Sequence, residues 1–284
     1  MKTRRRRIVL VGDTRKERSA AALAAHDAWL RRRFEIVIRD TDGTADLSEV
    51  RADIAVLFGG DGSILSVARR LAGNPMPVLG VNTGRFGFLA EVPLEAFRAT
   101  MARVLSRPIR TSNRMMFEVD VASGGRTRQR LLALNDAVIA RGSVSRMVHL
   151  NLFVGGSALT LVSGDGLIVA TPSGSTAHSL SAGGPIVHPE IEAMVVTPIC
   201  PHSLSMRPLV LPADRAVRID LAHKNGDVML TVDGQEVVPI EEGHSVTLRR
   251  ARKPFRLVDT GARPYYDALR DKMNFGGAFT ATIR

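Results

Sequence analysis

The chain has 284 residues, enough for one large or two small domains, and its 45% apolar and 24% charged residues are typical of a globular protein rather than a disordered one. Lysine and arginine exceed aspartate and glutamate by 39 − 28 = 11, a surplus that suits an anionic partner. No apolar stretch approaches the roughly 18 residues that a membrane span needs, and a single cysteine excludes an intramolecular disulfide and favours the reducing cytoplasm.

The first hundred residues alternate between apolar runs and helix-favouring segments. Short apolar runs typical of buried strands are found at 8–11, 34–38, 53–58 and 78–81. Segments typical of helices lie between and after them, at 17–33, 64–71 and 93–105. Strands that alternate with helices predict a mainly parallel sheet with both faces covered.

The pattern changes after Arg107-Pro108. Short β-type runs separated by turn residues follow, among them 116–121, 148–154, 217–221 and 228–232. Closely spaced turns of this kind predict an antiparallel β domain, and 265–273 is expected to be helical again. We therefore predict an α/β plus all-β protein. Residues 1–109 form a Rossmann-like α/β domain completed by a C-terminal helix within 262–284, and residues 110–261 form the β domain.

The block Gly59-Gly60-Asp61-Gly62-Ser63 joins a predicted strand to a predicted helix. Ligands of open α/β sheets bind beyond the carboxyl ends of the strands, and glycines there let backbone N–H groups approach phosphate oxygens. An aspartate at such a place can hold magnesium or accept a proton from an attacking hydroxyl. A tight turn in which Asp61 caps the next helix explains the block equally well. The block is not a Walker loop, since G-x-x-x-x-G-K-[ST] is not present.

Two further segments combine polar groups in a way that suits a sugar or a phosphate. Residues 164–185 run from a predicted strand into a loop rich in hydroxyls and glycines, although a turn-rich connection is as good an explanation. Asn135 and Asp136 place an amide and a carboxylate inside an apolar run, where they need partners. A ribose diol would supply them. Taken alone, this pair favours a β-bulge or an edge strand.

Together the three segments resemble the signature blocks of the NAD kinase family, and residues 199–208 and 232–235 resemble two further blocks. The resemblance runs from about Ile8 to Phe275. It implies transfer of a phosphoryl group to the 2′-hydroxyl of the adenosine ribose of NAD, which makes NADP. The implied donor is ATP or inorganic polyphosphate, with a divalent metal, for which Mg²⁺ is expected and no ligand residues are assigned. It also implies a cleft between the two domains, and a homodimer or homotetramer in which a neighbouring subunit completes the NAD site.

The resemblance assigns roles residue by residue. Asp61 matches the catalytic base, and Gly59, Gly60 and Gly62 lie beside it at the nucleotide. The positions that match NAD contacts or line the NAD pocket are Asn135, Asp136, Arg146, Ser163, Asp165, Thr176, Ala177, His178, Ser179, Leu180, Ser181, Cys200 and Gln235. Three of these depart from the family pattern: Asp136 stands for a glutamate, His178 for a tyrosine, and Ser163 for a residue that is often basic.

Two other functions are compatible with parts of the sequence. A lipid kinase of the diacylglycerol type would explain Gly59 to Ser63 and the positive charge, but it needs an acyl pocket or a membrane-facing patch. A non-enzymatic nucleic-acid binder would explain the charge and leave the glycine and hydroxyl blocks unexplained. Neither a membrane nor a nucleic acid is therefore expected as a partner. The run Arg4 to Arg7 is expected to be a solvated arm.

Overall fold

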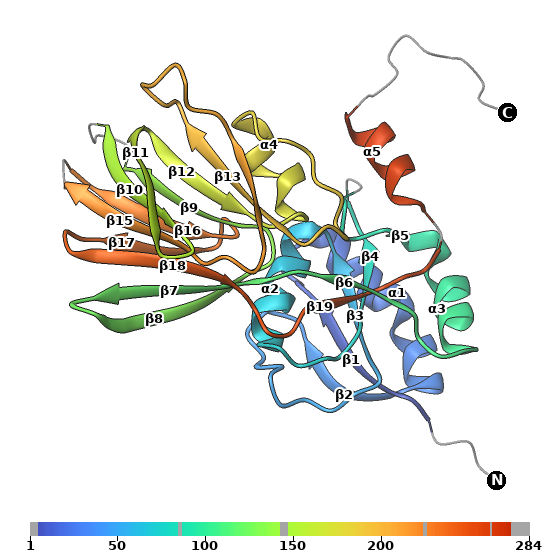
Figure 1. Ribbon diagram of the computed structural model, residues 1–284. Helices are drawn as coiled ribbons and strands as arrows, with labels where there is room; N and C mark the ends of the chain where they lie inside the picture. Colours follow the sequence, from blue (N-terminus) through green and yellow to red (C-terminus); the bar gives the residue numbers. More distant parts are fainter. Residues whose placement is uncertain (1–4, 85–86, 143–146, 224–225, 262, 274–284) are drawn as a thin grey trace, which may run out of the picture. The chain divides into compact units, whose positions relative to one another are not determined.

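The computed structural model describes residues 5–84, 87–142, 147–223, 226–261 and 263–273 (Figure 1). The chain divides into two compact units. The first comprises Met1–Arg70, Met76–Ser112 and Arg256–Arg284, and the second comprises Leu71–Pro75 and Asn113–Phe255. Arg4 and Arg146 lie outside the described residues. No helix in the described part of the chain combines the length and the apolar character needed to span a bilayer.

The first unit contains a seven-stranded sheet of order β2-β1-β3-β4-β19-β6, in which β4 also pairs with β5. Its strands are β1 (Arg7–Gly12), β2 (Glu35–Asp40), β3 (Ile54–Gly59), β4 (Val78–Asn82), β5 (Val92–Pro93), β6 (Thr111–Arg114) and β19 (Phe255–Val258). The pairs among β1 to β5 are parallel, as is that of β4 with β19. The mainly parallel sheet predicted from the sequence is confirmed. The chain re-enters this sheet through β19, a strand that the sequence pattern did not indicate.

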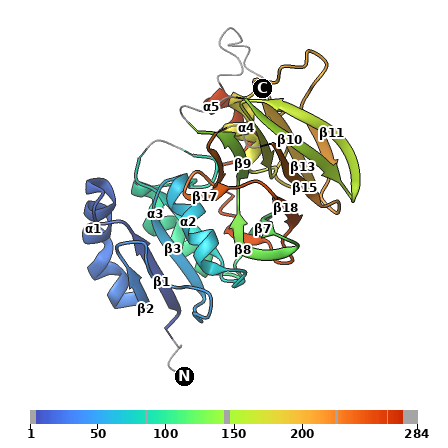
Figure 2. The same ribbon diagram turned by 90° about the vertical axis from the view of Figure 1, so that its left-hand side faces the viewer.

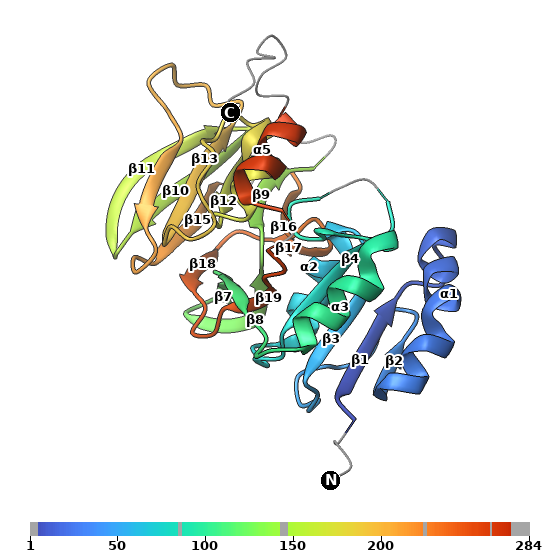
Figure 3. The same cartoon turned by 90° about the vertical axis from the view of Figure 1, so that its right-hand side faces the viewer.

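Helices cover both faces of this sheet (Figure 3). They are α1 (Glu17–Arg33), α2 (Asp61–Leu71), the 3-10 turn η1 (Leu94–Ala96) and α3 (Phe97–Leu105). The last helix, α5 (Tyr265–Met273), follows strand β19 in the chain and confirms the helix predicted at 265–273. Apolar side chains of α1 and α3 pack against Ile8, Leu10 and Val81 of the sheet. On α2, Ile64 packs where a Cβ on Gly80 of β4 would stand, so this helix covers the opposite face.

Two predicted helix boundaries in the first unit were wrong. Helix α2 begins at Asp61 rather than at residue 64, because an acidic residue is favourable in the first turn even where glycine follows it. Pro93 ends strand β5, and α3 begins only at Phe97. The 3-10 turn Leu94–Ala96 therefore separates the proline from the start of that helix.

The second unit is a sandwich of two antiparallel sheets (Figure 2). One has the order β11-β10-β15-β18-β7-β8, with β7 (Phe117–Ser123), β8 (Arg126–Ala133), β10 (Val148–Val154), β11 (Ser157–Gly164), β15 (Val217–His223) and β18 (His244–Arg250). The other has the order β14-β13-β12-β9-β16-β17, with β9 (Asp136–Arg141), β12 (Gly166–Ala170), β13 (Ala193–Ile199), β14 (Leu209–Pro212), β16 (Val228–Val232) and β17 (Glu236–Ile240). Alternating apolar side chains from both sheets form one core. The antiparallel β fold predicted from the turn spacing is confirmed.

Candidate functional site

The glycine block sits at the carboxyl end of β3, where it turns into α2. Gly59 is buried, and a Cβ there would lie 2.7 Å from the Ser63 hydroxyl oxygen. A Cβ on Gly60 would meet nothing within 4 Å. The fold therefore needs glycine at position 59 for packing, whereas the open space above Gly60 leaves its backbone accessible to a ligand. The first turn of α2, an 11-residue helix, also offers backbone N–H groups to an anion.

Asp61 is held by the backbone of a segment that follows the neighbouring strand β4. Its Oδ2 accepts a hydrogen bond of 2.7 Å from the N–H of Phe88, and its Oδ1 accepts bonds of 3.1 and 3.0 Å from Leu89 and Ala90. A Cβ on Gly87 would lie 1.7 Å from Oδ1, so only glycine lets the segment approach this closely. The carboxylate is thus fixed in one orientation.

A count of lone pairs shows what Asp61 has left to offer. Each carboxylate oxygen has about two acceptor positions. Within the described residues, Oδ1 uses two of them and Oδ2 uses one. Oδ2 therefore retains one acceptor position for an external donor such as a substrate hydroxyl.

The segment from Gly87 to Ala90 was not predicted from the sequence. Asn82, at the end of β4, organises it: its Nδ2 donates to the carbonyl of Ala90 and its Oδ1 accepts from the N–H of Gly84. The sequence did contain a feature that could have indicated it, because polar and glycine residues follow β4 just as they follow β3. Neighbouring parallel strands end at the same edge of a sheet, so the two segments are expected to lie close together.

In the second unit, Asn135 and Asp136 lie at the start of β9. This strand pairs without a register shift with β12 on one side and β16 on the other. The β-bulge or edge-strand interpretation favoured by the residues alone is therefore wrong. Instead Asp233 provides the partners: its carboxylate accepts the N–H groups of Leu134, Asn135 and Asp136 at 3.0, 2.8 and 3.2 Å. Asp233 has a positive φ of 52°, a conformation that aspartate tolerates better than most residues.

The carboxyl group of Asp136 is in an unusual electrostatic environment. Only 5% of the residue is exposed, and Asp233 is similarly buried at 6%. Burial, and to a lesser extent the charge of Asp233, raises the pKa of Asp136 to about 7. Near neutral pH this group is therefore present in both its protonated and its ionised form, able to donate as well as to accept a hydrogen bond.

The hydroxyl-rich segment is seated directly on this pair. The Thr171 hydroxyl donates to the carbonyl of Leu134 at 2.6 Å and accepts from the N–H of Gly174. A Cβ on Gly174 would lie 2.1 Å from the Asn135 carbonyl oxygen, so glycine is required there as well. The structure thus brings together two of the three segments that the sequence analysis singled out.

The segment after Thr171 is not the loop that the sequence predicted. It contains a 3-10 turn η2 (Gly174–Thr176) and a short helix α4 (His178–Ser181). The Ser179 hydroxyl is fully buried and bonds to Thr197 at 2.8 Å, so it points into the protein. Other predicted ligands differ in exposure: His178 and Ser181 are exposed, and Thr176, Ala177 and Leu180 are half-buried.

Asp165, Ser163 and Cys200 form a second group in this unit. Asp165 pairs with Arg141 at 2.7 Å, and this bond, with a smaller contribution from the Cys200 thiol, lowers the pKa of Asp165. The Ser163 hydroxyl bonds to Nδ1 of His149 at 2.8 Å. Arg141 and His149 were not predicted from the sequence as members of this group. Gln235 is exposed and follows Asp233 by two residues.

The described residues contain no group of three or more histidine, cysteine, aspartate or glutamate side chains placed to hold a metal ion. Magnesium does not require such a group, since it is commonly held by one or two carboxylates, by water and by substrate phosphates.

Comparison with known proteins assigns both units to one family. Residues 8–109 match the family model of the ATP-NAD kinase N-terminal domain, and residues 134–260 match that of the ATP-NAD kinase C-terminal domain. The NAD kinase of Geobacter metallireducens is 45% identical over 225 residues, which is 79% of this chain and 80% of that protein.

Two solved structures have the same fold. The yeast NADH kinase complexed with NADH has a TM-score of 0.85 at 25% identity, covering 99% of this chain and 91% of that one. An NAD kinase from Archaeoglobus fulgidus in complex with ATP has a TM-score of 0.72 at 25% identity, covering 95% and 98%. These matches leave no support for the lipid-kinase and nucleic-acid-binding alternatives. The chain belongs to the NAD kinase family and is a phosphotransferase that converts NAD to NADP.

Proposed function

We propose that Asp61 is the general base of this kinase, with Oδ2 as the accepting atom. A ribose hydroxyl is a weak nucleophile, and its proton must leave as the new bond to phosphorus forms. Three backbone N–H groups fix the Asp61 carboxylate while one acceptor position on Oδ2 stays open. This pre-organised oxygen is the observation that supports the proposal most strongly.

The transfer itself requires no covalent intermediate with the protein. The 2′ oxygen bonds to the γ-phosphorus of ATP, the bond from that phosphorus to the bridging oxygen breaks, and ADP leaves with the electron pair while Asp61 takes the proton. Positioning and charge neutralisation supply most of the acceleration in such reactions. The accessible backbone of Gly60 and the positive end of α2 suit the triphosphate. The Archaeoglobus relative in complex with ATP supports ATP as donor.

We also propose that the divalent metal arrives with the triphosphate as MgATP. Magnesium offsets the negative charge of the phosphates when it is bound. The described residues are compatible with this arrangement, because phosphate oxygens and water then provide most of the ligands. Inorganic polyphosphate remains a proposed second donor, since it presents the same chain of phosphate oxygens.

The NAD contacts are proposed to come from the second unit. Asp233 accepts hydrogen bonds from the backbone N–H groups of Asn135 and Asp136. Among the described residues the two side chains make no hydrogen bond or ion pair, so both remain for a ligand. The further proposed contacts are Ser163, Asp165, Thr176, Ala177, His178, Leu180, Ser181, Cys200 and Gln235. Ser179 belongs to the same proposed segment, and its buried hydroxyl holds the segment in place through Thr197. Arg146 is a proposed contact too, although it lies outside the described residues. The yeast relative complexed with NADH supports a dinucleotide acceptor.

The Asn135–Asp136 pair is tested by substrate discrimination. Asp136→Ala should raise KM for NAD at least tenfold while KM for ATP changes less than twofold, because a carboxyl that contacts the acceptor does not contact the donor. Initial rates with each substrate varied in turn measure both constants. Equal changes in the two would contradict the placement of this pair.

We propose that the enzyme is a homodimer or homotetramer whose NAD site is completed by a neighbouring subunit. Edge strand β11 supports this assembly, because Leu159 and Leu161 lie on one face of it and are 49% and 50% exposed. Light scattering should report a dimer or tetramer for the wild type. A wild type that stays monomeric at assay concentrations would contradict the proposal.

One assay tests the proposed reaction as a whole. The purified enzyme is given magnesium, NAD or NADH, and ATP or polyphosphate in all four combinations, and the NADP or NADPH formed is measured. Formation of NADP from NAD and ATP is the expected result. Turnover with polyphosphate but not with ATP would contradict ATP as the donor. Turnover without any divalent metal would contradict the proposed role of magnesium.

A further inference from the structure

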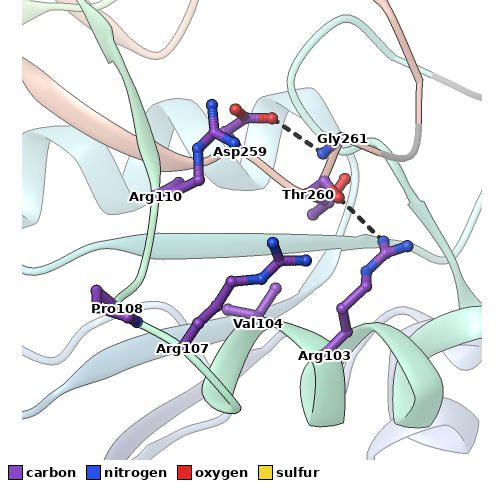
Figure 4. A pocket seen from close by; sticks show the side chains of 8 residues that line it. All are labelled: Arg103, Val104, Arg107, Pro108, Arg110, Asp259, Thr260 and Gly261. Carbon is purple, nitrogen blue, oxygen red and sulfur yellow. Dashed lines mark hydrogen bonds between the residues drawn. The ribbon is translucent and has the colours of Figure 1, made fainter.

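A cavity of about 210 Å³ lies in the first unit (Figure 4). It is formed by the last turn of α3 and the connection that follows it, by the residue before β6, and by the residues after β19. The side chains that matter here are Arg103, Arg107, Arg110 and Asp259. Three guanidinium groups and one carboxylate leave a net charge of 3 − 1 = +2 around this small space.

Two of the three arginines have no side-chain partner in the part of the chain that the structure describes. Arg103 is anchored, since its Nη2 donates to the Thr260 carbonyl at 3.0 Å. Among the described residues, the guanidinium groups of Arg107 and Arg110 make neither a hydrogen bond nor an ion pair. Figure 4 shows them beside the same cavity as Arg103. All three arginines are exposed, so solvent screens their mutual repulsion. An anion between them would be attracted by all three guanidinium groups at once.

Asp259 does not neutralise the arginines. Its Oδ1 accepts the N–H of Gly261 at 2.9 Å, which fixes the carboxylate within its own turn. No ion pair joins it to an arginine among the described residues. The cavity therefore presents donors that are still available to a ligand.

Size and chemistry together define the ligand. Pockets for drug-sized molecules and cofactors have volumes of about 300–1,000 Å³, so this cavity is too small for a nucleotide and suits a small anion. The planar guanidinium fork matches the oxygens of a phosphate group in a bidentate manner. A phosphate also carries the multiple negative charge that a net +2 site favours.

The cavity is separate from Asp61. The carbonyl of Leu105, at the end of α3, accepts a hydrogen bond from Nη2 of Arg6, which directly precedes β1. Asp61 follows β3, which pairs in parallel with β1 from Ile54 to Phe58. The end of α3 and Asp61 are therefore at opposite edges of the sheet (Figure 3), separated by a six-residue strand of roughly 20 Å.

We propose that this cavity is a binding site for a small phosphate anion of the size of inorganic phosphate or pyrophosphate, held by Arg103, Arg107 and Arg110. The site is distinct from the proposed transfer site. Bound anion stabilises the folded enzyme by mass action, and it binds less tightly as salt concentration rises.

The test is calorimetric titration of pyrophosphate, and in a second arm inorganic phosphate, into the full-length enzyme at low salt. The enzyme is first saturated with an ATP analogue that cannot transfer its phosphate, so that the donor site is filled. The test variant is Arg107→Gln/Arg110→Gln. The matched control is Arg126→Gln/Arg128→Gln, which makes the same change of charge at exposed positions on β8.

Wild type and control should bind one anion with equal affinity, and Arg107→Gln/Arg110→Gln should bind at least tenfold more weakly while keeping its kinase rate. Asp259→Asn should bind more tightly, because the amide still accepts from Gly261 but no longer repels the ligand. Equal binding by wild type and the Arg107→Gln/Arg110→Gln variant would overturn the proposal. No binding to wild type at millimolar concentration of either anion, or unchanged affinity in Asp259→Asn, would overturn it as well.

Discussion

The carboxylate of Asp61 accepts a hydrogen bond of 2.7 Å from the backbone N–H of Phe88. These two residues follow neighbouring parallel strands, and their contact is reinforced by the N–H groups of Leu89 and Ala90. A catalytic group must be held close to its productive geometry, and the three backbone donors restrict this carboxylate to one orientation. The contact therefore links the fold of the first unit to the proposed chemistry.

Replacing Asp61 by asparagine should lower kcat by about 10²–10⁴, the usual contribution of a general base. NAD should still bind, because the proposed NAD contacts lie elsewhere in the chain. Steady-state rates and equilibrium binding of NAD measure the two effects separately. Near-normal turnover by Asp61→Asn would refute the assignment of Asp61 as the base.

Gly87→Ala tests the position of the carboxylate without changing its chemistry. The new Cβ would overlap Oδ1 of Asp61, which must then move, and a displacement of about 1 Å can cost roughly 10² in rate. Gly84→Ala is the matched control, since a Cβ there meets nothing within 4 Å. We expect kcat to fall about 100-fold in the first variant and to stay near the wild-type value in the second. Equal rates in both would show that the contact is not needed.

The glycines that precede Asp61 should respond differently to the same substitution. Gly59→Ala forces a Cβ against the Ser63 side chain and should destabilise the fold by about 1–3 kcal/mol. In Gly60→Ala the new methyl group meets no other atom of the ligand-free protein, so the free energy of unfolding should change by no more than about 0.5 kcal/mol. The substitution should nevertheless raise KM for ATP about tenfold, ~1.4 kcal/mol, because the methyl group occupies the space proposed for phosphate. An unchanged KM in Gly60→Ala would place the phosphate elsewhere.

Much of the fold was predictable from local patterns, since buried strands and turn-bounded β runs have a short-range signature. What local patterns could not show are contacts across large sequence separations. Asp61 meets residues 27 to 29 positions later, and Asp233 meets residues 97 to 99 positions earlier. The central position of β9 depends on β12 and β16, which the sequence around Asn135 does not contain. The resemblance to NAD kinases, rather than periodicity, singled out Asp61 as a base.

The raised pKa of Asp136 predicts a pH-dependent stability. Its pKa in the folded protein is about 7, compared with an ordinary value of 3.8, because the group is buried near Asp233. Between these values the folded protein holds a proton that the unfolded chain has released. The free energy of unfolding therefore falls as pH rises from about 4 to 7. Above pH 7 the loss due to this carboxyl is complete and amounts to at most ~4 kcal/mol.

Asp136→Asn removes this titration. Relative to wild type, the variant should gain stability as pH rises from 5 to 8, and the gain should vanish near pH 4. Denaturant unfolding of both proteins at several pH values measures the difference. A difference that does not change with pH would contradict the raised pKa.

The central claim, that Asp61 takes the proton of the ribose 2′-hydroxyl, is tested most directly by a crystal structure of Asp61→Asn with NAD and an inert ATP analogue bound. The distance to measure runs from the side-chain atoms of residue 61 to the 2′ oxygen of the adenosine ribose. Hydrogen-bond reach, about 2.6–3.2 Å, is the predicted result. A 2′ oxygen beyond that reach, with another acidic or basic side chain in contact with it, would contradict the account.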